Sequence, residues 1–137
     1  LYVTRVVAPM MAEQRRGHII NVGSLAGKEV YPNGNVYAAS KHFVDALTRS
    51  MRIDLLHQHV KVSQVAPGLA ETEFSEVRYD GDKDRAEQVY QGFRPLTGAD
   101  IADVVFWQAS APDHVNIADV LVIPSDQANS TTVNKDA

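Results

Sequence analysis

The sequence predicts an α/β protein in which helices alternate with the strands of a parallel, doubly wound sheet. Three short segments are predicted to be strands: the apolar run at 18–23, and the segments at 60–66 and 117–123. Longer stretches with apolar residues at helical spacing flank these runs, at about residues 3–16, 36–58 and 97–110. Strands that alternate with helices pair in parallel through right-handed crossovers, which is the arrangement of a doubly wound sheet.

A change in apolar spacing predicts the first helix and strand. Apolar residues share one helical face at Val3, Val6, Val7, Met10 and Met11. Pro9 is expected to kink this helix, and Gly17 is expected to end it. The run HIINVG at 18–23 then shows no helical period and closes on a glycine, which predicts a buried strand.

The middle of the chain predicts a loop, a long helix and a second strand. Residues 24–35 are rich in glycine and proline and are therefore predicted to be a loop. Helical spacing returns over 36–58, and the second strand over 60–66 ends at Pro67-Gly68. Ligands of doubly wound sheets bind beyond the carboxyl ends of the strands, so Ser24 and Pro67-Gly68 lie where a site is expected.

Residues 69–94 mix acids and bases without a clear period. They are predicted to be an irregular excursion with one short helix near 83–90. Thr97 and Asp100 have the spacing of a capping box, which predicts the start of the last helix.

The last helix and the tail complete the pattern. Phe106 and Trp107 are expected to pack the last helix onto the sheet. After the third strand, the polar tail from Ser125 is predicted to be either frayed or held by a partner subunit.

Composition excludes several classes of protein. The 137 residues suit one domain, since domains average roughly 150 residues. The net charge of −4 provides no broad cationic field, so nucleic acid is not expected as a partner. Cysteine is absent, which excludes thiolate metal sites and cysteine nucleophiles, and no other metal-ligand spacing is recognisable. No apolar run approaches the roughly 20 residues of a membrane span.

Tyr37, Lys41 and Ser24 form a candidate proton-transfer site. Tyr37 and Lys41 are four residues apart on the predicted long helix, so their side chains share one face. A nearby ammonium favours the ionised phenolate, and such a tyrosine can exchange a proton with an alcohol or a carbonyl. Ser24 follows a strand and could hydrogen-bond the same oxygen.

The spacing of Tyr37 and Lys41 is weak evidence when taken alone, because it also suits a surface tyrosine stacked on a lysine. Tyr79 and Lys83 have the same spacing, but they span the turn sequence Asp-Gly-Asp and are not expected to share a helix. The context favours chemistry at Tyr37, since a strand ending in Gly-Ser and a glycine-rich loop precede YAASK.

The motifs GHIINVGSLAG, NVYAASK and VSQVAPGLAETEF resemble the catalytic half of a short-chain dehydrogenase/reductase. The segments PGLAETEFSEVRYDGD and HVNIADVLVIP further resemble the bacterial NADP-dependent 3-hydroxy acid dehydrogenase (serine dehydrogenase) subgroup of that family. The resemblance implies that residues 1–137 are the C-terminal, catalytic part of a single Rossmann-type domain.

The resemblance also implies roles for individual residues. Tyr37 would be the general acid and base, Lys41 would assist it and hold the nicotinamide ribose, and Ser24 would orient the substrate oxygen. The residues expected to bind the cofactor are Tyr37, Lys41, Pro67, Gly68 and Thr72. NADP is the expected cofactor, with NAD as an alternative.

Two parts of the family pattern are missing from this sequence. The dinucleotide fingerprint needs two glycines spaced by one residue, and no pair among the eight glycines has that spacing. The family's catalytic asparagine would fall just before Leu1. We therefore expect that the N-terminal, dinucleotide-binding part is absent, and that half a sheet leaves one strand edge and much apolar surface uncovered.

The expected substrate is a small 3-hydroxy acid such as serine or 3-hydroxypropionate, or the matching semialdehyde. Arg78 lies in the excursion, where a guanidinium could bind a carboxylate bidentately, although a solvated loop arginine is an equal alternative. Tyr79, Arg85 and Arg94 are weaker candidates. The rival functions are reduction of uncharged ketones or aldehydes, and an inactive fragment or oligomerisation half. The resemblance further implies a cytoplasmic homo-oligomer, either a dimer or a tetramer.

Overall fold

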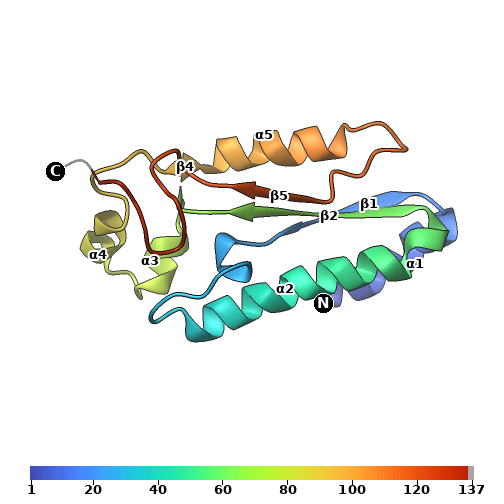
Figure 1. Cartoon of the computed structure of the whole chain (residues 1–137). Helices are drawn as coiled ribbons and strands as arrows, with labels where there is room; N and C mark the ends of the chain where they lie inside the picture. Colours follow the sequence, from blue (N-terminus) through green and yellow to red (C-terminus); the bar gives the residue numbers. More distant parts are fainter. Residues whose placement is uncertain (136–137) are drawn as a thin grey trace.

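Three parallel strands form the central layer of the structure, a computed structural model that describes residues 1–135. The strand order is β1 (Gly17–Val22), β2 (Val60–Pro67) and β5 (Asp119–Val122). Helices α1 (Tyr2–Gln14) and α2 (Asn35–Asp54) cover one face, and α5 (Gly98–Ala109) covers the other (Figure 1). The parallel α/β sheet predicted from the sequence is confirmed.

The core is centred on β2, which has a strand on each side and helices on both faces. Val62, Val65 and Ala66 are completely buried. A strand enclosed in this way is buried on both faces, so its polar side chains must be paired. Ser63 donates a hydrogen bond to Asn116, and Gln64 donates one to Asp45.

Strand β1 departs from the prediction of a buried strand. Its residues are partly exposed, and Val22 is 55% exposed. Among the described residues β1 pairs only with β2, so it lies at an edge of the sheet. The expected uncovered strand edge is therefore present.

Helix α1 ends earlier than predicted, and a different residue caps it. Its last residue is Gln14, and Arg15 adopts the left-handed conformation that caps it, with φ of 50°. Gly17 is the first residue of β1 and not the helix stop. A Cβ there would lie 2.8 Å from the Cβ of Met11, so this glycine allows α1 to pack closely on β1.

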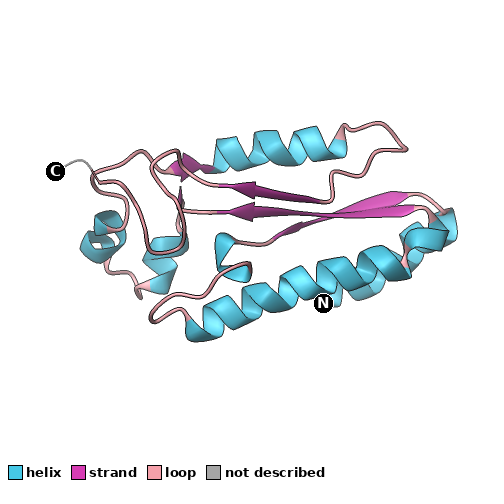
Figure 2. Cartoon of the chain, viewed as in Figure 1, coloured by secondary structure: helices cyan, strands magenta, loops and turns pink. Residues whose placement is uncertain are grey.

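The excursion contains more structure than predicted, as Figure 2 shows. It holds two short helices, α3 (Phe74–Arg78) and α4 (Lys83–Gln88), where one was expected. Two short strands, β3 (Ala70–Glu71) and β4 (Leu96–Thr97), bracket it and pair in parallel. A turn at Asp80 and Gly81, both with positive φ, separates the helices, so Tyr79 and Lys83 share no helix, as expected.

Helix α5 begins as predicted, but its inward face differs from the expectation. The capping box of Thr97 and Asp100 is confirmed. The prediction that Phe106 and Trp107 pack onto the sheet is wrong, since they are 73% and 56% exposed. The helical period turns Gln108 inward instead, where its Nε2 donates to the carbonyl oxygens of Gln64 and Ile117.

The C-terminal segment, residues 125–135, is held by the chain's own residues. The Glu29 carboxylate accepts hydrogen bonds from the backbone N–H and the hydroxyl of Ser130, both at 2.8 Å. The Oε1 of buried Gln127 accepts from the backbone N–H of Leu69 at 2.9 Å. The prediction of a frayed tail is therefore wrong for residues 125–135, and the alternative of contact with a partner subunit stays a prediction. Residues 136–137 of the predicted tail lie outside the described residues. Within the described part of the chain, no helix is long and apolar enough to cross a membrane.

Candidate active site

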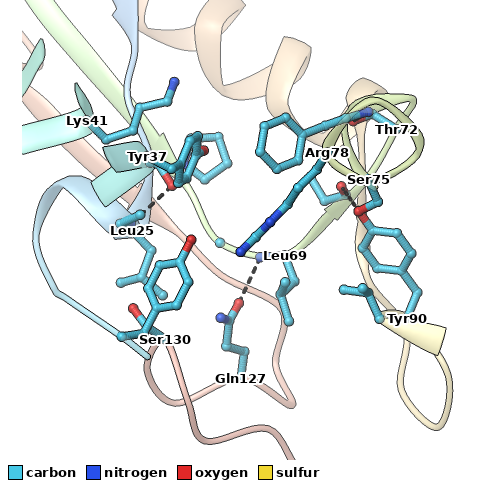
Figure 3. Close-up of a pocket in the computed structure, with 18 of the residues that line it drawn as sticks. Leu25, Tyr37, Lys41, Leu69, Thr72, Ser75, Arg78, Tyr90, Gln127 and Ser130 are labelled. Carbon is cyan, nitrogen blue, oxygen red and sulfur yellow. Dashed lines mark hydrogen bonds between the residues drawn. The ribbon is translucent and has the colours of Figure 1, made fainter. Parts of the chain in front are cut away.

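A pocket of about 860 Å³ lies beyond the carboxyl ends of β1 and β2 (Figure 3). The excursion and residues of the C-terminal segment complete its wall. All the residues that the sequence analysis selects for catalysis, cofactor and substrate line this one pocket: Ser24, Tyr37, Lys41, Pro67, Gly68, Thr72 and Arg78. Of the weaker candidates, Tyr79 and Arg85 also line it, whereas Arg94 is not among the lining residues.

Ser24 is fixed by a backbone contact at the end of β1. It is extended, and it caps the short 3-10 helix η1 (Leu25–Gly27). Its Oγ accepts a hydrogen bond from the backbone N–H of Ala26 at 3.1 Å. Because a hydroxyl can accept and donate at once, its proton stays available to a ligand in the pocket.

Close packing of η1 against α2 brings Ser24 to the face that carries the tyrosine. Gly27 is buried, and a Cβ at this position would lie only 2.7 Å from the backbone oxygen of Lys41. Any larger residue would push η1 away from α2. The glycine therefore sets the separation between the Ser24 loop and the turn of α2 that holds Lys41.

Tyr37 and Lys41 lie one turn apart on α2. The Lys41 Nζ is 5.8 Å from the centroid of the Tyr37 ring and donates to the backbone oxygen of Val22 at 3.2 Å. Burial lowers the pKa of Lys41. The other neighbour of Tyr37 is Phe74, whose ring centroid is 5.2 Å away. The lysine thus links the face of α2 that carries Tyr37 to the end of β1.

Arg78 reaches into the pocket from α3, toward the side that carries Tyr37 (Figure 3). Its guanidinium carbon is 5.8 Å from the centroid of the Tyr31 ring and 5.7 Å from that of Tyr79. No carboxylate of the described residues forms a salt bridge with it. This cation therefore stays free to bind an anion.

A family model described as short chain dehydrogenase matches residues 1–83, more than half of the chain. The chain belongs to the short-chain dehydrogenase family. This membership agrees with the geometry above, in which a serine, a tyrosine and a lysine line one pocket at the carboxyl edge of a parallel sheet.

Individual members of the short-chain dehydrogenase family match most of this chain. The NADP-dependent 3-hydroxy acid dehydrogenase YdfG of Escherichia coli is 44% identical over 129 residues, which is 93% of this chain and 52% of that protein. An uncharacterized oxidoreductase of Mycobacterium tuberculosis is 44% identical over 131 residues, which is 96% of this chain and 52% of that protein.

A solved structure of serine dehydrogenase complexed with NADP⁺, in its closed form, superposes on this chain with a TM-score of 0.92 at 42% identity. The match covers 99% of this chain and 55% of that one. This chain therefore spans about half the length of the relatives that it matches.

Behind the pocket of this short-chain dehydrogenase lies a buried carboxylate that the sequence analysis missed. Asp45 on α2 is 3% exposed and accepts hydrogen bonds from Lys28, at 2.5 Å, and from Gln64, at 2.9 Å. Arg49 also donates to it, and Lys28 further contacts Asp119. Asp45 shares a helical face with the buried Ala38 and Thr48, and this spacing is the sequence signal that could have revealed it.

The charges of this buried group shift both pKa values. Burial raises the pKa of Asp45, but the hydrogen bonds from Lys28 and Gln64 outweigh burial and place that pKa below its usual range. Burial lowers the pKa of Lys28, but the hydrogen bonds to Asp119 and Asp45 outweigh it and raise that pKa. Asp45 and Lys28 are therefore both charged at neutral pH, and they join α2 to η1.

The sequence analysis also did not select most of the other residues of the pocket wall, among them Tyr31, Gln127 and Ser130. Tyr31 follows η1, and the other two belong to the C-terminal segment. No spacing rule connects these segments to the catalytic motif, because only the folded chain brings them together.

Proposed function

We propose that this chain provides the proton-transfer site of an NADP-dependent oxidoreductase acting on a small 3-hydroxy acid, such as serine or 3-hydroxypropionate, or on the matching semialdehyde. The main observation is that Ser24, Tyr37 and Lys41 line one pocket with Arg78, whose guanidinium forms no salt bridge with a described residue. The names of the E. coli relative and of the superposed serine dehydrogenase support the same substrate class.

The proton step belongs to Tyr37. Its hydroxyl gives a proton to the carbonyl oxygen during reduction and takes it back during oxidation. Ser24 donates a hydrogen bond to the same oxygen and orients it. The positive charge of Lys41, 5.8 Å from the Tyr37 ring, stabilises the phenolate that forms when the proton leaves.

The residues present fit the nicotinamide and ribose end of NADP. Lys41 carries three N–H donors, of which its hydrogen bond to Val22 uses one, so donors remain for ribose hydroxyls. Pro67, Gly68 and Thr72 follow β2 and line the same pocket. When bound, NADP would accept or supply the hydride, and the protein contributes position and the proton.

Arg78 gives the site its preference for acids. A guanidinium binds a carboxylate through two parallel N–H···O bonds, which fixes both the charge and the orientation of the substrate. With its carboxylate on Arg78, a short hydroxy acid would place its hydroxyl toward Tyr37.

Replacing Tyr37 with Phe tests the mechanism in the protein expressed from its complete coding sequence. We expect kcat to fall by about a hundredfold or more, since general acid–base catalysis contributes roughly 10²–10⁴. Turnover near the wild-type rate would refute the role of Tyr37. An intact-mass measurement on the same sample gives the length of the chain that carries the activity. A complete lack of activity in every sample would favour the alternative that the chain is an inactive fragment.

Arg78→Ala tests the substrate class. We expect kcat/KM to fall on the hydroxy acid and to stay unchanged on its methyl ester, which is uncharged at that end. Equal activity on both compounds before and after the change would favour a reductase of uncharged carbonyls instead.

We also propose a homo-oligomeric state. Large apolar side chains on the outer surfaces of α1 and α2 are exposed, among them Val3, Val6, Met10 and Phe43. Burying such a surface in a subunit interface would stabilise the assembly. Light scattering coupled to size-exclusion chromatography gives the mass that tests this, and a monomer would refute it.

A further inference from the structure

Tyr31 lies in the wall of the pocket and packs against the turn that precedes α2. Its ring lies against Gly34, where a Cβ would come within 2.7 Å of the Tyr31 Cζ. The backbone N–H of Gly34 donates to the backbone oxygen of Tyr31 at 3.0 Å, and Asn33 between them has a φ of 63°. A tight turn before α2 therefore fixes the place of this ring.

The ring of Tyr31 is one of two that contact Arg78. The guanidinium carbon lies 5.8 Å from the Tyr31 centroid and 5.7 Å from the Tyr79 centroid, within range of a cation–π interaction. Tyr79 follows Arg78 directly in the chain, and its ring is also approached by Arg85 at 4.5 Å. Tyr31 instead belongs to the loop that begins at Ser24, so of these two rings it is the one that connects Arg78 to the side of the pocket that carries Ser24.

We propose that Tyr31 positions Arg78 for the substrate carboxylate and thereby determines the preference for acids. This inference rests on the proposed function. The ring attracts the face of the guanidinium and leaves its N–H edge free for a carboxylate. An exposed arginine otherwise samples many rotamers, and ordering them before binding reduces the entropy that binding costs.

The test compares four proteins expressed from the complete coding sequence: Tyr31→Leu, Tyr31→Phe, Arg78→Ala and the double variant Tyr31→Leu with Arg78→Ala. Each is assayed on the hydroxy acid and on its methyl ester with NADP. We expect Tyr31→Leu to raise KM for the acid about fivefold or more and to leave KM for the ester and for NADP unchanged. Tyr31→Phe keeps the ring and is expected to keep the low KM for the acid.

The double variant distinguishes an effect of Tyr31 on Arg78 from an effect of Tyr31 on the shape of the pocket. If the ring acts through Arg78, Tyr31→Leu adds no further rise in KM for the acid once Arg78 is alanine. An equal rise in that background, or an equal rise for the ester or for NADP, would overturn the inference. Phe106→Leu on α5, at an aromatic residue that is 73% exposed and outside the pocket, is the matched control and should leave the KM for the acid, the ester and NADP unchanged.

The two proposals fail in different ways. If Arg78→Ala does not distinguish acid from ester, the proposed substrate class fails and the role of Tyr31 fails with it. If Arg78→Ala is selective but Tyr31→Leu is not, only the positioning role of Tyr31 is refuted.

Discussion

Asp45→Asn removes one negative charge from the buried group behind the pocket and keeps the shape of the side chain. Asp45 is 3% exposed and accepts from Lys28, Gln64 and Arg49. Losing one partner of a fully buried ion pair costs about 3–5 kcal/mol. Here Lys28 keeps its contact with Asp119, and water can solvate the Arg49 side chain, which is 67% exposed. Neither cation is therefore left buried without a partner, and the expected loss is smaller.

We therefore expect Asp45→Asn to lower the free energy of unfolding by about 2–3 kcal/mol. Urea unfolding of the complete protein, followed by circular dichroism, measures this as a drop in midpoint of about 1 M, since m is roughly 1–3 kcal/mol per M. Asp119→Asn is the matched control, because that carboxylate is 39% exposed and its loss should cost at most about 1 kcal/mol.

The pH dependence of the free energy of unfolding, compared between wild type and Asp45→Asn, gives a second test. The pKa of Asp45 is lower in the folded protein than its ordinary value of 3.8, so its contribution to stability is present above pH 3.8. That contribution is lost as the pH falls through the lower, folded-state pKa. The difference between wild type and Asp45→Asn should thus be constant from pH 8 to 5 and shrink below 3.8. A loss below about 1 kcal/mol at pH 7 would refute the buried ion pair as a source of stability.

Two further substitutions probe contacts that hold the loop after Ser24 and the C-terminal segment in place. Gly27→Ala places a Cβ 2.7 Å from the Lys41 oxygen and should destabilise the protein by about 1–3 kcal/mol, measured by thermal unfolding. Gly98→Ala has open space and is the neutral control, so equal losses at both sites would contradict the packing argument. Glu29→Ala removes both hydrogen bonds to Ser130 and should speed amide hydrogen exchange across residues 124–135 about tenfold. Ser130→Ala keeps the backbone bond and should have a smaller effect, and unchanged exchange in Glu29→Ala would refute the anchor.

The sequence predicted the elements whose patterns are local. The parallel strands and the long helix follow from apolar spacing, and the capping box of Thr97 and Asp100 follows from four consecutive residues. The predictions that are wrong concern residues whose structure depends on a contact outside their own sequence pattern. Gly17 was expected to end α1, but Arg15 does so, and the glycine is needed because Met11 lies against it. The tail from Ser125 has no pattern of its own, because its anchor is the distant Glu29.

The sequence by itself determined the family and the edge of the sheet where the candidate residues gather. The order of strand, serine, loop and YAASK helix suffices, because parallel strands all present their carboxyl ends at one edge. Only the tertiary structure decided which residues lie behind the pocket and which lie across it from Tyr37. Asp45 is paired with Lys28, and Arg78 with Tyr31, through contacts between segments far apart in the chain. Burial and the direction of side chains depend on such contacts, and no local spacing encodes them.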